Sequence, residues 1–101
     1  MSIPQGSTPT NYFDLPIEAA MLATLRITFK QGDEIILEKE LADCVSDGNV
    51  LTLTLTQDET LMFDHNKPGK VQLHGRTIGG QALVSQVFVF TVDELLSGRV
   101  V

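Results

Sequence analysis

The chain of 101 residues has the size of one domain, and 43% hydrophobic with 20% charged residues is typical of a folded globular protein. Thirteen acidic and seven basic residues give a formal net charge of -6, and the basic residues are spread along the chain without a cluster. Such a charge repels phosphate backbones and anionic lipid, so we expect no binding to nucleic acid and no membrane association. No apolar run reaches the roughly 18 residues that a spanning helix needs. The single cysteine, Cys44, excludes an internal disulfide and predicts a reducing compartment, the cytoplasm.

The N-terminal segment differs from the rest of the chain. Residues 1–11 are polar, rich in Pro, Ser and Thr, and without periodicity. They predict a disordered tail or a docking arm, followed by a single domain over residues 12–101. Residues 12–15, closed by Pro16, predict a short edge strand. Residues 17–22 have helix propensity but are too short to hold a helix alone, so a helical turn and an extended segment both remain open.

A first hairpin is predicted over residues 24–41. Apolar and polar residues alternate over residues 24–30, and Gln31–Asp33 forms the turn that returns the chain. A two-residue turn would place charged side chains on the buried side. The register therefore favours a three-residue turn, which sets Phe29 opposite Ile35.

A second hairpin is predicted around Ser46–Asn49, because Asp-Gly supplies the positive φ angles of a tight turn. Pairing outward from this turn sets Cys44 opposite Leu51. Continuing the same register would set Leu41 opposite Thr54, which is the wrong face. We therefore expect a bulge, or a crossing from one sheet to another, between Leu41 and Cys44.

Residues 50–56 alternate perfectly between apolar residues and threonine, which predicts a strand with one face in the core. The apolar residues that face the core are Leu51, Leu53 and Leu55. Thr56 and Glu59 then form a capping box, which predicts a short helix from Gln57 to about Phe63 with Leu61 packed against the core.

Residues 71–77 predict another strand, and Gly79–Gly80 predicts a two-residue turn into a strand over residues 81–92. A second capping box at Thr91 and a glycine stop at Gly98 predict a helical turn near Asp93.

The C-terminal half of the strand over residues 81–92 is apolar on both faces. Val87 and Val89 occupy one face, and Phe88, Phe90 and Val92 occupy the other. Because strands of this kind are usually covered on both sides, we expect the N-terminal segment or a partner subunit to cover Val87 and Val89. The sequence therefore predicts self-association. The candidate interface residues are Val87, Val89, Tyr12 and Phe13.

The sequence contains no convincing catalytic or metal constellation. Its paired carboxylates lie at turns or helix starts, where acids serve solubility and capping. Adjacent Asp64 and His65, with His74, make a poor metal site, and Cys44 has the setting of a small buried thiol. We expect no enzymatic activity, no catalytic residues, no metal and no cofactor. The rival hypothesis is a small ligand- or carbohydrate-binding module with a pocket lined by Tyr12, His74 and Arg76.

The order of these features resembles a known family. The segments that carry the resemblance are Leu15-Pro16, Thr28–Asp33, Asp47–Asn49, Leu53–Leu61, Lys70–Leu73, Gly79-Gly80 and Val92–Leu96. Together they resemble the small Ig-like β-sandwich proteins of prophages in Gram-positive bacteria, which are distantly similar to the N-terminal domain of phage baseplate upper proteins. The resemblance covers about residues 13–98 and implies a structural or assembly role in the tail or baseplate. It implies other phage structural proteins as partners, in the host cytoplasm or the virion, and no catalytic residues.

The predicted fold class is all-β. We expect a two-layer Ig-like β-sandwich of six or seven antiparallel strands, with one short helix after the third main strand. The function that these expectations support is non-enzymatic and depends on contacts between proteins.

Overall fold

The computed structural model describes residues 2–96, which form an all-β structure with short helical connections. The strands are β1 (Ser2–Pro4), β2 (Thr10–Asp14), β3 (Leu22–Gln31), β4 (Glu34–Glu40), β5 (Val45–Asp47), β6 (Val50–Thr54), β7 (Gly69–Thr77), β8 (Ala82–Val84) and β9 (Phe88–Asp93). The helical segments are the 3-10 turns η1 (Ala19–Met21) and η2 (Leu41–Asp43) and the helix α1 (Gln57–Thr60).

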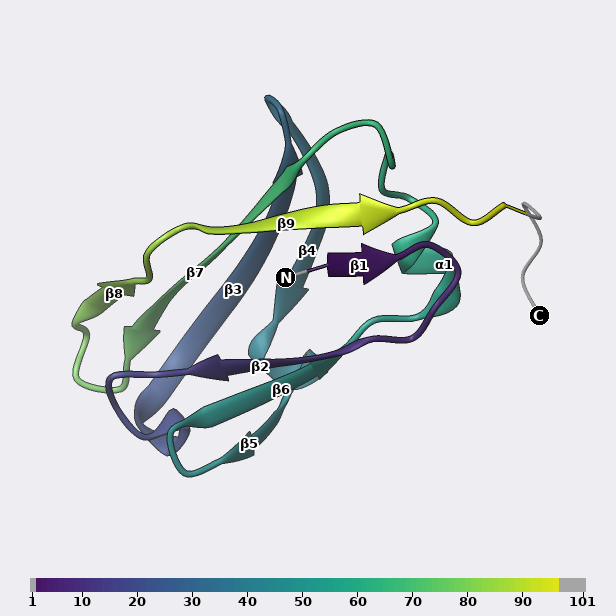
Figure 1. Ribbon diagram of the computed structural model, residues 1–101. Helices are drawn as coiled ribbons and strands as arrows, with labels where there is room; N and C mark the ends of the chain where they lie inside the picture. Colours follow the sequence, from purple (N-terminus) through teal and green to yellow (C-terminus); the bar gives the residue numbers. More distant parts are fainter. Residues whose placement is uncertain (1, 97–101) are drawn as a thin grey trace.

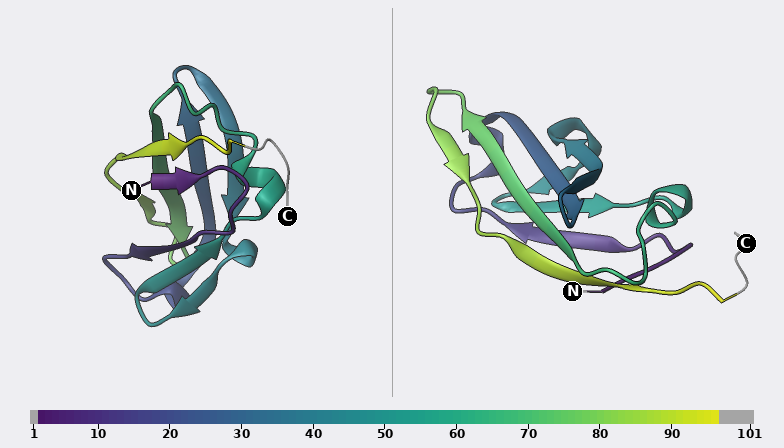
Figure 2. Two further views of the ribbon diagram at one scale, coloured as in Figure 1. Left: turned by 45° about the vertical axis from the view of Figure 1, so that its right-hand side comes forward. Right: turned by 90° about the horizontal axis from the view of Figure 1, so that it is seen from above.

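Two sheets pack face to face (Figures 1 and 2). The larger sheet has the strand order β1-β9-β7-β3-β4, with β8 pairing to β7, and the smaller sheet has the order β2-β6-β5. The predicted all-β, two-layer Ig-like sandwich is therefore confirmed. The strands of residues 2–96 number nine, more than the six or seven expected, and β1 runs parallel to β9.

The core lies between the sheets and follows the predicted alternation. Leu51, Leu53 and Leu55 are all fully buried, as expected for the inner face of β6. The rings of Phe29, Phe63 and Phe90 contact one another, with centroids 5.2 to 6.0 Å apart. Aromatic residues that bury large apolar areas in such tilted arrangements contribute strongly to stability.

The N-terminal segment is part of the sandwich, so the prediction of a disordered tail over residues 1–11 is wrong for residues 2–11. β1 pairs with β9, where Ile3 lies opposite Val92 and is fully buried. The Gly6 N–H donates to the Thr60 hydroxyl at 2.9 Å, which ties the same segment to α1. The physical reason is that β1 supplies partners for the outer edge of β9, and one isoleucine fills the core beneath it.

The β3–β4 hairpin corrects the predicted register. Its turn has two residues, because Gln31 lies opposite Glu34, and the register then shifts between Phe29 and Lys30. Beyond that bulge Phe29 lies opposite Leu37, so the predicted pair with Ile35 is wrong. A two-residue turn without a bulge would place charged side chains of β4 on the buried side. The extra residue at the bulge changes the register, so that Leu37 lies on the inner face opposite Phe29.

The turn of the β5–β6 hairpin has two residues, as predicted, but lies one residue later in the chain, at Gly48-Asn49. Asp47 lies opposite Val50 and Ser46 opposite Leu51, so Cys44 does not pair with Leu51. The predicted crossing between Leu41 and Cys44 is confirmed, since η2 carries the chain from β4 in the larger sheet to β5 in the smaller one.

The helix after β6 has the predicted start and an earlier end. The Thr56 side chain accepts from the Glu59 N–H, and the Glu59 side chain accepts from the Thr56 N–H, which confirms the capping box. α1 ends at Thr60 and not near Phe63. Thr60 and Phe63, three positions apart, are the buried residues here. Leu61 lies between them and is only half-buried, so its predicted packing against the core is wrong.

The strand expected over residues 81–92 is divided into β8 and β9. Arg76 lies opposite Ala82, and the Thr77 N–H donates to the Gln81 carbonyl oxygen at 2.8 Å. The loop between these two residues therefore has three residues, 78–80, and not the predicted two. After β8 the Ser85 hydroxyl accepts from the Leu73 N–H at 2.9 Å, which interrupts the backbone ladder. β9 then runs through to Asp93, so the predicted helical turn is wrong up to residue 96. Gly98 lies outside the described residues.

The helical turn left open over residues 17–22 is present as η1, and β2 is an edge strand of the smaller sheet, as predicted for residues 12–15.

The burial of Ile3 can be tested by truncation. We expect Ile3→Ala to lower the free energy of unfolding by about 2 to 5 kcal/mol, because it leaves a cavity beneath β9. Chemical denaturation of the purified protein measures this change. Ile3→Val is the matched control and should cost only about 0.5 to 1.5 kcal/mol. Equal stability of Ile3→Ala and the parent chain would contradict the placement of β1.

Candidate functional site

The predicted interface residues do not form one patch. Val87 and Val89 are 48% and 60% exposed, and Tyr12 is 71% exposed. Tyr12 lies in the smaller sheet and Val89 in the larger one, so they occupy opposite outer faces of the sandwich. Phe13 is buried and its ring contacts that of Phe88, with centroids 6.4 Å apart. Its assignment to the interface is therefore wrong, because the β2 alternation points it into the core.

The outer face of the larger sheet carries a row of residues that we name the lysine row. Across four neighbouring strands, Val89 lies opposite Lys70, Lys70 opposite Lys30, and Lys30 opposite Ile35. Residues directly opposite in antiparallel strands project to the same side. Val89 and Ile35 are both more than half exposed, so the row is apolar at its two ends and basic between them.

The two lysines of this row have no acidic partner among the described residues. Arg26, farther along β3, lies 3.7 Å from a Glu38 oxygen and 3.9 Å from a Glu40 oxygen. No ion pair within residues 2–96 includes Lys30 or Lys70. Like charges directly opposite on paired strands repel, so this pair favours an external anion.

The outer face of the smaller sheet carries the opposite charge. Asp14 and Asp47 both lie opposite Val50, one from each side, and we name these three residues the aspartate row. The neighbouring row places the exposed side chains of Tyr12 and Val45 on either side of Thr52.

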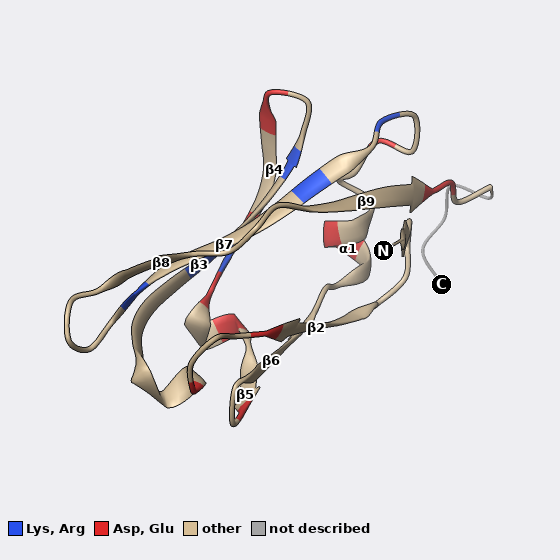
Figure 3. Ribbon diagram, turned by 60° about the vertical axis from the view of Figure 1, so that its left-hand side comes forward, with Lys and Arg blue, Asp and Glu red and all other residues tan. Residues whose placement is uncertain are grey.

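The smaller sheet has no basic residue, whereas the larger sheet carries both signs, with Glu38 and Glu40 beside Arg26. Residues 1–25 and 41–66, which include β2, β5 and β6, contain no lysine or arginine. Figure 3 shows only acidic charged positions on and around these strands, whereas the basic positions lie on the larger sheet together with the acidic positions of β4. The pairing of strands thus gathers basic residues that are scattered in the sequence, and the lysine row was missed because it depends on the register.

A groove of about 760 Å³ opens beside Arg26 in the larger sheet. His74 and Arg76 line it together, as the ligand-binding hypothesis requires, but Tyr12 does not. Leu41 and Val84 add apolar walls. Neither phenylalanine nor tyrosine lines the groove, so it lacks the stacking rings that sugars prefer.

Residues 2–96 contain no group of three or more His, Cys, Asp or Glu side chains placed to hold a metal ion. His65, in the loop before β7, has its Nε2 3.7 Å from a Glu94 carboxylate oxygen. His74, in contrast, lines the groove. Within the described part of the chain, no helix is long and apolar enough to cross a membrane.

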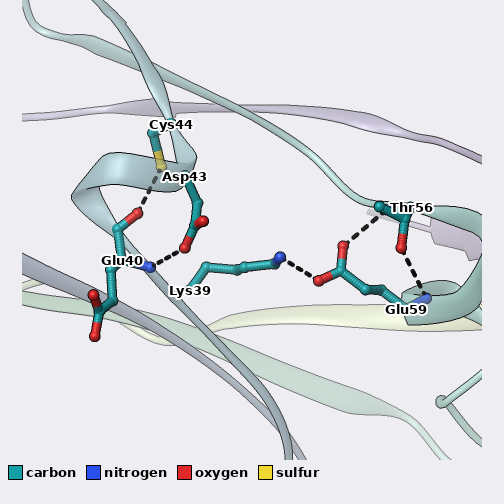
Figure 4. Close-up of polar contacts among 6 residues, drawn as sticks. All are labelled: Lys39, Glu40, Asp43, Cys44, Thr56 and Glu59. Carbon is teal, nitrogen blue, oxygen red and sulfur yellow. Dashed lines mark hydrogen bonds and ion pairs between the residues drawn. The ribbon is translucent and has the colours of Figure 1, made fainter.

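Cys44 follows η2, and its thiol lies 3.6 Å from the Glu40 carbonyl oxygen (Figure 4). Burial, and then the negative charge of Asp43, raise the pKa of the Cys44 thiol, and Lys39 only partly opposes them. A raised pKa keeps the thiol protonated, which makes it a weak nucleophile.

The capping box at α1 is connected to the larger sheet by an ion pair. The Lys39 ammonium from β4 contacts the Glu59 carboxylate, and both side chains are less than one-fifth exposed (Figure 4). Burial of the carboxyl is the largest single influence and raises its pKa. The contacts with Lys39 and Thr56 together outweigh burial, so the pKa of Glu59 lies below its ordinary value.

This lowered pKa makes a contribution to stability that depends on pH. Because the Glu59 pKa is lower in the folded chain than in the unfolded one, the contribution is fully present above the ordinary glutamate pKa. It is lost as the pH falls through the folded-state pKa. We expect Glu59→Gln to lower the melting temperature at neutral pH and the difference from the parent chain to shrink in acid.

Thermal unfolding across a pH series measures this difference. Glutamine can still accept at the helix start, so the variant removes mainly the charge. Asp58→Asn, an exposed neighbour, is the control and should show a smaller pH-dependent difference. A Glu59→Gln difference that is constant from neutral to acidic pH would contradict the ion pair.

No protein-family model and no curated protein matches the sequence. Among solved structures, the chain is similar to the V domain of amphioxus IgVJ-C2, with a TM-score of 0.38 and 13% sequence identity. That match covers 93% of this chain and 100% of the other.

Proposed function

We propose that this chain is a non-enzymatic structural or assembly protein of a prophage that acts through the outer faces of its two sheets. The observation that carries this proposal is that each outer face combines exposed apolar residues with unbalanced charge. Such a combination is typical of protein contact surfaces, where apolar contacts supply affinity and charges select the partner.

The phage context comes from the sequence resemblance over residues 13–98, with Leu55–Leu61 as its most specific segment. It names tail or baseplate proteins as the partners, in the host cytoplasm during assembly or in the virion afterwards. The proposed contacts between proteins do not depend on any catalytic role of the groove beside Arg26 or of the capped helix α1. A second copy of the chain is a further candidate partner.

Particle purification tests this role directly. After induction of the prophage in its host, we expect the chain to copurify with particles or tail intermediates in a fixed ratio to the other structural proteins. Quantitative mass spectrometry of gradient fractions measures that ratio. A chain that is expressed but stays absent from particles and from every assembly intermediate would exclude the phage role.

A small-ligand-binding module is the second candidate, because His74 and Arg76 line one groove. Two arginines and one glutamate, Glu40, line the groove, and this excess of positive charge favours a small carboxylate over a neutral sugar. Amide chemical shifts during titration with citrate and, separately, N-acetylglucosamine would test it. Binding predicts saturable shifts at residues 74–76 that Arg76→Gln weakens, with Lys67→Gln as control. Unchanged shifts with both probes would count against this candidate.

A further inference from the structure

We infer that copies of this chain associate front to back, with the lysine row of one copy against the aspartate row of the next. This inference rests on the proposed function and specifies one partner, a second copy of the chain. Three independent features of the two rows support it.

The first feature is charge. Lys30 and Lys70 lie opposite each other without an acidic partner in residues 2–96, whereas Asp14 and Asp47 lie on a face without lysine or arginine. Contact between the rows relieves the repulsion within each of them. Contact between two lysine rows would instead bring four ammonium groups together, so a symmetric dimer through this face is disfavoured.

The second feature is the exposed apolar area beside the charges. Val89 and Ile35 flank the two lysines, and each is more than half exposed. On the other face, Tyr12 and Val45 are both 71% exposed in the row next to Asp14 and Asp47. Contact between the faces therefore removes apolar area from water on both copies.

The third feature is the placement of the rows on opposite sides of the sandwich. The lysine row belongs to the larger sheet and the aspartate row to the smaller one, and the two sheets lie on opposite sides of the shared core (Figure 2). Both rows occupy strand positions that alternate with buried residues, so both project outward. One copy can therefore bind two neighbours at once. A contact between different surfaces of identical copies does not close at two, so it generates chains or rings.

The strength of this contact is limited by its size. The smaller sheet has three strands of five residues or fewer, so its outer face is small. Contacts that bury less than about 1,200 Å² in total are typical of weak, transient association. We therefore expect assembly at high protein concentration or where another structure holds the copies close together.

Sedimentation velocity over a range of protein concentrations tests the inference. We expect the average mass to rise with concentration at low salt, past the dimer, and to fall at high salt, because ions screen exposed charges within about 10 Å at 0.1 M and about 3 Å at 1 M. A strict monomer at every concentration in low salt would overturn the inference. Growth that stops at the dimer would overturn it as well.

Charge reversal then identifies the faces. Lys70→Glu and Asp47→Lys should each weaken association by about tenfold, since each replaces an attraction with a repulsion. Mixing the two variants should restore association, because the intact face of each meets the intact face of the other. Lys67→Glu, a loop residue outside the row, has the same change in charge as Lys70→Glu and should associate like the parent chain.

Each alternative has a distinct outcome. Stronger association of Lys70→Glu than of the parent chain would show that two lysine rows meet, which overturns the front-to-back contact. A mixture that stays monomeric would overturn it too. Circular dichroism confirms that each variant is folded. If the chain is found in particles but never self-associates, only this inference fails; if it self-associates but is absent from particles, only the phage role fails.

Discussion

The structure depends on the packing of three phenylalanine rings between its parts. Phe29 comes from β3, Phe90 from β9 and Phe63 from the segment after α1, and all are almost fully buried. Gly69 is part of this packing, because a Cβ at that position would lie 2.1 Å from the Phe90 ring. The cluster therefore holds the larger sheet against the segment that follows β6 of the smaller sheet. The relative position of the two outer faces depends on this packing.

The same alternation that builds the core also builds the surfaces. Phe29 and Val71 point inward, so the residues adjacent to them in their strands, Lys30 and Lys70, point outward. Leu51 likewise points inward next to the outward Val50. The charges of the two faces are thus a consequence of strand geometry, and reversing them leaves the core unchanged.

Thr60 connects the N-terminal segment to the rest of the domain. Its fully buried hydroxyl lies 3.0 Å from the carbonyl oxygens of Ser7 and Gln57 and accepts from the Gly6 N–H. A buried hydroxyl costs free energy unless it has partners, so these contacts favour one path for residues 2–11. Polar composition alone predicted disorder there, since no local pattern shows that a single isoleucine will be buried by β9.

The sequence by itself determined what depends on near neighbours: the alternating leucines of β6 and the capping box at Thr56. It predicted an irregularity between Leu41 and Cys44, and the tertiary structure decided that this is a crossing between sheets and not a bulge. Registers and partners of strands were decided by the tertiary structure, because a bulge or a one-residue change in a turn alters every later pair. The outward position of Val89 was predicted, since it follows from alternation along β9. The pairing of Lys30 with Lys70 was not, because it joins residues 40 positions apart through a register that only the assembled sheet specifies.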